Sequence, residues 1–156
     1  MDLLPSWAPN AHPLLVHFPI ALFIAAVLVD WMVMLVGRRC DPLKPTATLL
    51  YVLGTAATVA TYFTGRAASQ TTWIPGMAHP IVKAHWDWGF RTVWYFGILT
   101  GIRLTLVWAP APVTSPRVRA ALALAGLVGL GLLYETGDRG AQLVYEHGVG
   151  VAAPRH

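Results

Sequence analysis

Apolar residues are gathered into four long blocks along the chain, separated by short segments rich in proline, glycine and charge. A run of about 20 apolar residues is long enough to cross a bilayer as a helix. The first block contains only His17 and Asp30 as ionisable residues. The blocks cover residues 14–36, 46–64, 84–108 and 117–134. The pattern predicts an integral membrane protein with four spanning helices.

The segments between the blocks predict how the helices are arranged. The sequence GRRCDPLKP closes the first block and APAPVTSP stops the third, because glycine and proline end helices. Short connections make successive helices run antiparallel. We therefore expect a single domain, an all-α up-down-up-down four-helix bundle, and we find no sequence repeat within it.

The last part of the chain predicts one further, shorter helix. In the sequence GDRGAQLVYEHG, Asp138 is placed to cap a helix start and Gly148 is placed to end it. We expect a short interfacial helix over residues 138–147, lying on the outer surface of the membrane.

Basic residues set the expected orientation, because cytoplasmic loops of membrane proteins carry an excess of Lys and Arg. The N-terminal tail has neither type before the first block. The first and third loops carry Arg38, Arg39, Lys44, Arg117 and Arg119. The bias predicts that both termini lie outside the cytoplasm, and it attributes the net charge of +4 to topology and not to nucleic-acid binding.

Composition agrees with a membrane protein, since only 12% of the residues are charged, against about 25% in soluble domains. The single cysteine, Cys40, excludes an internal disulfide, and no Cys-x-x-Cys-His motif offers covalent haem attachment. Hydrolytic catalysis is disfavoured, because no serine lies in a nucleophile-elbow context.

All the histidines fall on one side of the membrane in this topology. They are His12, His17, His79, His85, His147 and His156. A lone histidine at an interface usually makes a hydrogen bond, which we expect of His79 and His156, but several histidines gathered at one face predict a shared site. His17 and His85 open the first and third helices, which are diagonal partners in a four-helix bundle. Two imidazoles that face each other across a bundle core can be the axial ligands of a b-type haem.

We therefore expect His17 and His85 to be haem ligands. His12 and His147 would bind a second haem or hydrogen-bond the first ligands. Small residues, with Gly89 and the stripe Gly54, Thr58, Thr61 and Gly65 among them, would leave room for a porphyrin. Three outer cations would pair with its propionates, namely Arg66, Arg91 and Arg139.

Other interpretations of these residues stay open. Stripes of small residues also let membrane helices pack closely without any cofactor. The outer histidines, with Asp87 and Glu135, supply ligands that suit copper, zinc or iron, although no spacing copies a known metal signature. His12 and His17 are five residues apart, so they do not share one helical face.

Two charges lie deep within the predicted spans, Asp30 in the first and Arg103 in the third. Charges in the membrane are costly and normally pair. We expect a salt bridge between Asp30 and Arg103 that fixes the two diagonal helices together. The functional alternative is a proton-binding or quinone-binding site on the cytoplasmic side.

The motifs HPLLVHFPIAL and TGDRGAQLVYEHGVGV resemble the DUF2231 family of small bacterial membrane proteins, whose function is unknown. The resemblance covers nearly the whole chain. It implies a four-helix protein of the bacterial inner membrane in which His12, His17, the His85 region and His147 share one site. Ala141 departs from the closing motif, which more often has a second glycine there.

Three functions follow from these expectations. The first is electron transfer between the quinone pool and a periplasmic partner or a larger complex, because a haem with two histidine ligands has no open position for a substrate. The second is binding or transport of copper, zinc or iron by the outer histidines. The third is that of a non-catalytic accessory subunit in a respiratory or photosynthetic complex.

Overall fold

The computed structural model describes residues 10–107 and 115–151, and every regular element in that part of the chain is a helix. A short helix, α1 (His12–Leu15), is followed after Val16 by the first long one. The long helices are α2 (His17–Val36), α3 (Lys44–Thr71), α4 (His79–Val107) and α5 (Pro116–Tyr145). Two 3-10 turns, η1 (Gly37–Leu43) and η2 (Gly76–Ala78), lie in the connections.

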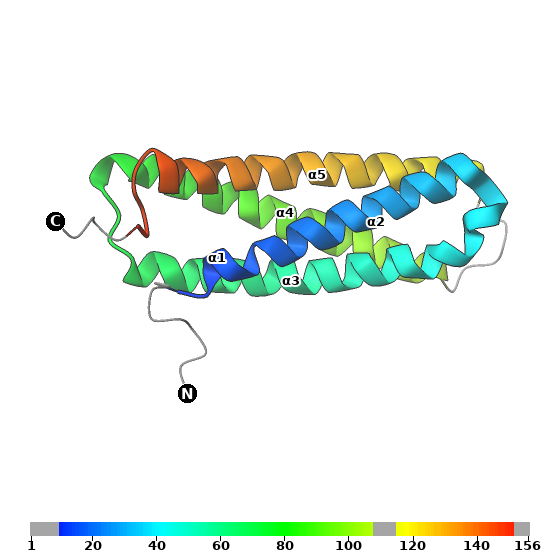
Figure 1. Ribbon diagram of the computed structural model, residues 1–156, viewed down its shortest axis with the longest axis horizontal. Coiled ribbons are helices and arrows are strands. Elements are labelled where there is room, and N and C mark those ends of the chain that lie inside the picture. Colours follow the sequence, from blue (N-terminus) through cyan, green and yellow to red (C-terminus); the bar gives the residue numbers. More distant parts are fainter. Residues whose placement is uncertain (1–9, 108–114, 152–156) are drawn as a thin grey trace, which may run out of the picture.

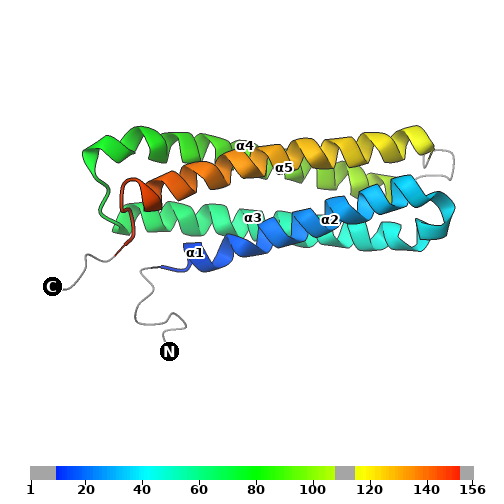
Figure 2. The same cartoon turned by 45° about the horizontal axis from the view of Figure 1, so that its top comes forward.

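The four long helices lie side by side and form an elongated bundle (Figure 1). Helix α2 packs against α3 and α5, and α4 packs against the same two helices, so α2 and α4 are diagonal to each other (Figure 2). One end of the bundle carries α1, the α3–α4 connection and the last turn of α5 (Figure 1). We call it the histidine end, and we call the other the η1 end.

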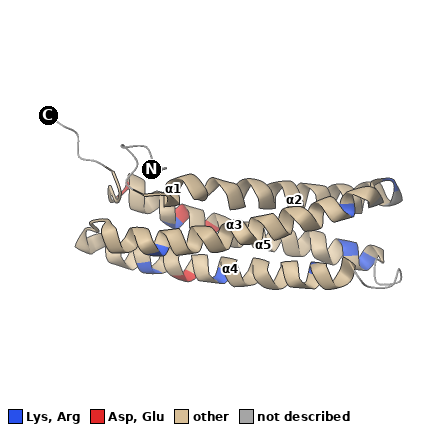
Figure 3. Cartoon of the chain, turned by 90° about the horizontal axis from the view of Figure 1, so that it is seen from below, with Lys and Arg blue, Asp and Glu red and all other residues tan. Residues whose placement is uncertain are grey.

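The outside of the bundle is apolar. Leu28 and Leu35 on α2 are 64% and 73% exposed, and Ile98 on α4 is 59% exposed. Charged residues on the visible side gather toward the two ends, with a largely uncharged stretch between them (Figure 3). Three segments are long and apolar enough to cross a membrane: His12–Val36, α3 and α5. An apolar exterior of this kind is suited to contact with lipid.

The core is centred on aromatic rings from three helices. Phe23 of α2 and Phe96 of α4 stack with ring centroids 3.5 Å apart and planes 8° from parallel. Tyr51 of α3 packs beside both, and all three side chains are fully buried. Close helix packing at this level depends on glycine, because a Cβ at Gly54 or Gly129 would lie within 2.7 Å of the Phe23 or Phe96 ring respectively.

The expected short helix over residues 138–147 is wrong as a separate element, because α5 continues through it to Tyr145. Side-chain pairs one turn apart bridge the junction: Arg139 contacts Glu135 at 2.7 Å, and Gln142 donates to Asp138 at 2.8 Å. Asp138 therefore lies inside a helix and does not cap one. Gly148 has a positive φ of 63° just beyond the helix, as expected of a terminating glycine.

The bundle contains a structural repeat that the sequence did not reveal. Three residue pairs meet across its axis, from the histidine end toward the η1 end: His12 with His85, Phe23 with Phe96, and Asp30 with Arg103. Each pair has the same separation of 73 positions, as between Asp30 and Arg103. The hairpin of α2 and α3 is thus repeated by the hairpin of α4 and α5, about an axis along the bundle.

Candidate cofactor site at the histidine end

His12 and His85 face each other inside the histidine end. Their ring centroids are 6.3 Å apart and their planes are 82° from parallel. His12 comes from the short helix α1, and His85 comes from the second turn of α4. Both side chains are partly buried. The two rings belong to equivalent positions of the structural repeat, so each hairpin contributes one of them.

Each ring is held by a backbone carbonyl of the other helix in its hairpin. Nδ1 of His12 lies 3.1 Å from the carbonyl oxygen of Thr61, and Nδ1 of His85 lies 2.9 Å from that of Thr136. A carbonyl can only accept, so Nδ1 carries the proton in both hydrogen bonds. In a neutral imidazole this leaves the lone pair on Nε2, which is the arrangement of a metal-bound histidine.

Glycine lets each ring approach the helix that holds it. A Cβ at Gly65 of α3 would lie 2.8 Å from Cε1 of His12, and a Cβ at Gly140 of α5 would lie 3.2 Å from Cε1 of His85. Each glycine follows, by one helical turn, the threonine whose carbonyl accepts the hydrogen bond from the histidine. In both hairpins a Thr-x-x-x-Gly motif therefore holds the histidine, with the threonine carbonyl accepting from the ring and the glycine leaving room for it.

Threonine hydroxyls support the two carbonyl positions. The hydroxyls of Thr92 and Thr136 are 2.9 Å apart and link α4 to α5 directly next to His85. Thr64 donates to the Thr61 carbonyl at 3.0 Å on the other hairpin. The stacked rings of Phe23 and Phe96 lie about three helical turns from the histidine pair, toward the middle of the bundle.

His17 does not take the place that the sequence predicted for it. It is the first residue of α2, and its side chain is exposed. Val16, between α1 and α2, has helical dihedrals (φ −58°, ψ −27°), so His12 and His17 lie on different faces of one nearly continuous helix, and His12 is the one that points to the bundle axis. The structure thus brings His85 together with His12, and the expected pairing of His85 with His17 is replaced.

The remaining histidines lie apart from this pair. His79 is exposed, with Nδ1 3.1 Å from the Gly76 carbonyl oxygen. His147 is partly buried beyond the end of α5, and its Nδ1 is a buried atom without a hydrogen-bond partner among the described residues. His156 lies outside the described residues.

A polynuclear metal centre finds no support in the part of the chain that the structure describes, where no three His, Cys, Asp or Glu side chains are grouped to hold an ion. The two carboxylates expected near the histidines are engaged elsewhere. Asp87 is exposed and accepts from Lys83 at 2.8 Å, and Glu135 pairs with Arg139 at 2.7 Å.

The three arginines predicted to bind propionates all lie toward the histidine end, but they differ in whether they are already paired with a carboxylate. Arg139 is paired with Asp138 at 2.7 Å as well as with Glu135. Arg66 and Arg91 are exposed, and each lies over an indole ring, at 5.7 Å from Trp86 and 4.8 Å from Trp88. A Cβ added at Gly89 would meet only the Thr136 side chain, at an ordinary 3.8 Å, and neither histidine of the pair.

A family model described as a predicted membrane protein, DUF2231, matches residues 8–153. The chain belongs to the DUF2231 family. This confirms the resemblance carried by the two terminal motifs, and the matched region includes both His12 and His85. No curated protein and no solved structure matches this DUF2231 chain.

The arrangement in this DUF2231 protein can supply two neutral imidazole ligands from opposite sides of one site. Sequence reasoning missed the groups that fix them, which are the carbonyls of Thr61 and Thr136 and the glycines Gly65 and Gly140. These groups could have been found from the Thr-x-x-x-Gly motif, which occurs at residues 61–65 of α3 and again at residues 136–140 of α5.

Proposed function

We propose that this DUF2231 protein crosses the bacterial inner membrane four times as an up-down-up-down bundle, with the histidine end on the periplasmic side. Three candidate spans and the apolar exterior support this placement. Helix α4 has 29 residues, close to the 28 of α3 and the 30 of α5, and its buried charge, Arg103, is neutralised by Asp30. Basic residues gather at the η1 end, in η1 and at the starts of α3 and α5, as cytoplasmic segments do.

We propose further that His12 and His85 are the axial ligands of a b-type haem. A bond from a metal to an imidazole nitrogen is about 2 Å long, and the nitrogen lies about 1 Å from its ring centre, so two opposed ligands of one ion place their ring centres about 6 Å apart. The observed 6.3 Å agrees with this separation. The observation that carries the proposal is this pair, with both Nδ1 atoms bound to carbonyls.

The surrounding residues have defined roles in this proposal. The carbonyls of Thr61 and Thr136 fix the ring orientations and make the Nε2 lone pair of each histidine a stronger metal ligand. Phe23 and Phe96 exclude water from the middle of the bundle. Arg66 and Arg91 are the exposed cations that would hold the haem propionates. Arg139 already pairs with Glu135 and Asp138, so it would have to leave one of these carboxylates to bind a propionate.

A haem held by two imidazoles supplies reversible one-electron transfer and offers no open position to a substrate. We therefore propose electron transfer between the quinone pool and a periplasmic partner or a larger complex. The test is the optical spectrum of the detergent-purified protein before and after dithionite. The proposal expects a Soret band that sharpens and shifts on reduction, and a colourless protein would refute it.

Copper is the second candidate, because the same pair of neutral imidazoles suits a copper ion and no third protein ligand is grouped with it among the described residues. Metal analysis distinguishes the two candidates. About one copper per chain without a Soret band would favour copper binding. Iron and porphyrin present in equal amounts would favour haem.

A further inference from the structure

Helix α4 presents two different faces. Its inward face carries His85, Phe96 and Arg103, which meet their partners across the bundle axis. The bridge from Arg103 to Asp30, at 2.6 Å, confirms the pair expected from the sequence. Among the described helices, α4 packs on α3 and α5, so its outer face is left to lipid or to another molecule.

The outer face of α4 follows a heptad pattern. Positions spaced alternately four and three apart form one stripe along a helix, which is the pattern by which one helix packs along another. The stripe consists of Lys83, Asp87, Phe90, Trp94, Gly97, Gly101 and Leu104. All of them are exposed except Gly97, which is half-buried. We call this stripe the α4 seam.

Two glycines in the α4 seam lie open. A Cβ at Gly97 or Gly101 would meet nothing within 4 Å among the described residues, whereas Gly54 and Gly129 lie directly against a phenylalanine ring. Glycine is less favourable than alanine inside a helix, so an open pair has no benefit within the single chain. The sequence GILTG is a Gly-x-x-x-Gly motif, which lets the backbones of two membrane helices approach closely.

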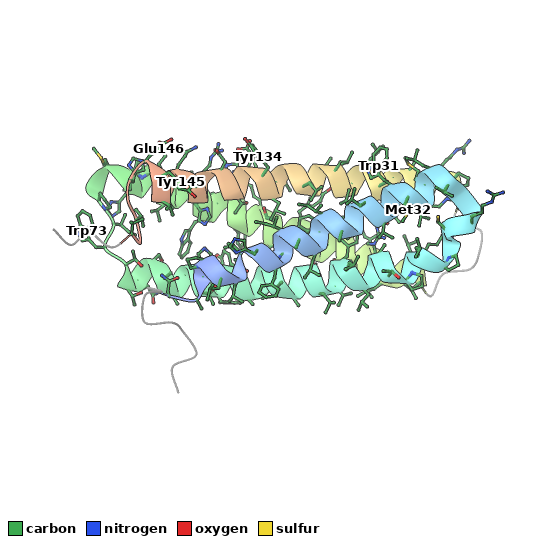
Figure 4. All side chains as sticks on the ribbon, in the orientation of Figure 1. Trp31, Met32, Trp73, Tyr134, Tyr145 and Glu146 are labelled. Atoms are coloured by element: carbon green, nitrogen blue, oxygen red, sulfur yellow. The ribbon has the colours of Figure 1, made fainter. Side chains whose placement is uncertain are left out.

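The structural repeat supplies a comparison for these two positions. Through the separation of 73, Gly97 and Gly101 correspond to Ile24 and Leu28 on α2. Ile24 and Leu28 are 44% and 64% exposed. Side chains project outward along the length of the bundle (Figure 4), as lipid-facing residues do. The glycines of α4 depart from this pattern and favour a second helix over lipid at this face.

The polar part of the α4 seam indicates which molecule fits it. Among the described helices, α4 is the long one that falls outside the three candidate spans. Lys83 and Asp87 carry opposite charges in the seam, and their side chains are 77% and 51% exposed. Two copies of this chain share one orientation in the membrane, so their seams run parallel and each lysine faces the aspartate of the other copy. The seam is thus complementary to itself, as a two-fold interface requires.

We propose that the protein forms a parallel homodimer through the α4 seam, with Gly97 and Gly101 at the closest approach of the two α4 helices. Phe90 and Trp94, whose ring centroids are 6.1 Å apart, supply the apolar contact between the glycines and the charged pair. The dimer brings together the two helices that carry His85. The inference depends on the membrane placement of the bundle and not on its cofactor.

The test counts chains in vesicles of phosphatidylethanolamine and phosphatidylglycerol. Cys40 is the single cysteine, so one maleimide dye labels each chain, and stepwise photobleaching at decreasing protein-to-lipid ratios separates dimers from monomers. We expect dimers of the wild-type chain. Gly97→Leu and Gly101→Leu each place a large side chain in the seam and should weaken dimerisation about tenfold, which corresponds to about 1.4 kcal/mol. Both variants should keep the wild-type thermal midpoint, because each added side chain starts in open space.

The matched control is Gly131→Leu, since Gly131 is an equally open glycine on α5. This variant should dimerise as the wild type does. Monomers at every density would overturn the inference and leave lipid as the cover of the seam. Unchanged dimerisation in both seam variants, or an equal loss in Gly131→Leu, would overturn it as well.

Cross-linking tests the face independently. In a Cys40→Ser background, Leu104→Cys places a thiol in the α4 seam, and Leu28→Cys places one on α2 at the equivalent of Gly101. Oxidation with copper phenanthroline should link the Leu104→Cys chains into a disulfide dimer and leave the Leu28→Cys chains monomeric. The reverse result would assign the contact to α2 and overturn the inference. His12→Ala separates this inference from the haem proposal, because it should lose haem and keep the dimer.

Discussion

The imidazole rings of His12 and His85 meet at right angles, with planes 82° apart, although they come from separate hairpins. Their equivalence in the repeat extends to what holds them, a threonine carbonyl at Nδ1 and a glycine beneath the ring. The two rings are therefore held alike, and neither is a spare group that another histidine could replace.

The angle between the ring planes predicts the magnetic signature of the site. With a haem held as proposed, nearly perpendicular imidazole planes would leave two iron d orbitals close in energy, so the oxidised protein would give a highly anisotropic low-spin resonance with one dominant low-field feature. Electron paramagnetic resonance of the oxidised protein at low temperature measures this. A three-line rhombic spectrum would mean nearly parallel rings and would contradict the geometry.

Alanine at Gly65 should weaken cofactor binding, because its Cβ would lie 2.8 Å from the His12 ring. Overpacking costs about 1–3 kcal/mol, which corresponds to roughly a 5- to 150-fold loss of affinity. Gly140→Ala should have a smaller effect, since its closest contact is 3.2 Å. Haem content per chain is the measurement.

Gly131 on α5 is the matched control, because nothing would lie within 4 Å of its Cβ. Gly131→Ala should keep full haem content. If Gly65→Ala also kept it, the seating of His12 on α3 would be wrong.

Loss of the buried salt bridge should destabilise the bundle. Asp30→Asn leaves the Arg103 guanidinium without its counter-charge, and breaking a buried pair in this way costs about 3–5 kcal/mol. We expect a clear fall in the thermal unfolding midpoint in detergent. Asp87→Asn removes the exposed pair with Lys83 and should change the midpoint little. Equal midpoints for the two variants would show that the Asp30–Arg103 pair does not hold α2 to α4.

The apolar blocks predicted the helices because a membrane-length apolar run has few alternatives, and the depth of Asp30 and Arg103 predicted their pairing for the same reason. Helix ends were less predictable. Helix α5 runs on past Tyr134 because the pairs of Arg139 with Glu135 and of Gln142 with Asp138 continue it. Of the two glycines in this stretch, Gly140 lies beneath the His85 ring, where a Cβ would be 3.2 Å from it, whereas a Cβ at Gly137 would meet nothing within 4 Å.

His12 and His17 lie on different faces of a nearly continuous helix, because Val16 between α1 and α2 keeps helical dihedrals. His12 precedes Phe23 and Asp30 by 11 and 18 positions, which are whole numbers of helical turns, so helical phase favours His12 as the residue on the bundle axis. The repeat was hidden because only a few paired positions, such as Phe23 and Phe96, carry the same residue. Opposite charges at Asp30 and Arg103 obscure it further.

The optical spectrum of two matched variants tests the central claim most directly. His12→Ala and His17→Ala remove histidines five positions apart in the same terminal motif, and each protein is purified in detergent and reduced with dithionite. The structure predicts that His12→Ala loses the Soret band, or gains that of a five-coordinate haem, while His17→Ala keeps the wild-type spectrum. Loss of the band in His17→Ala with a normal spectrum in His12→Ala would contradict the account.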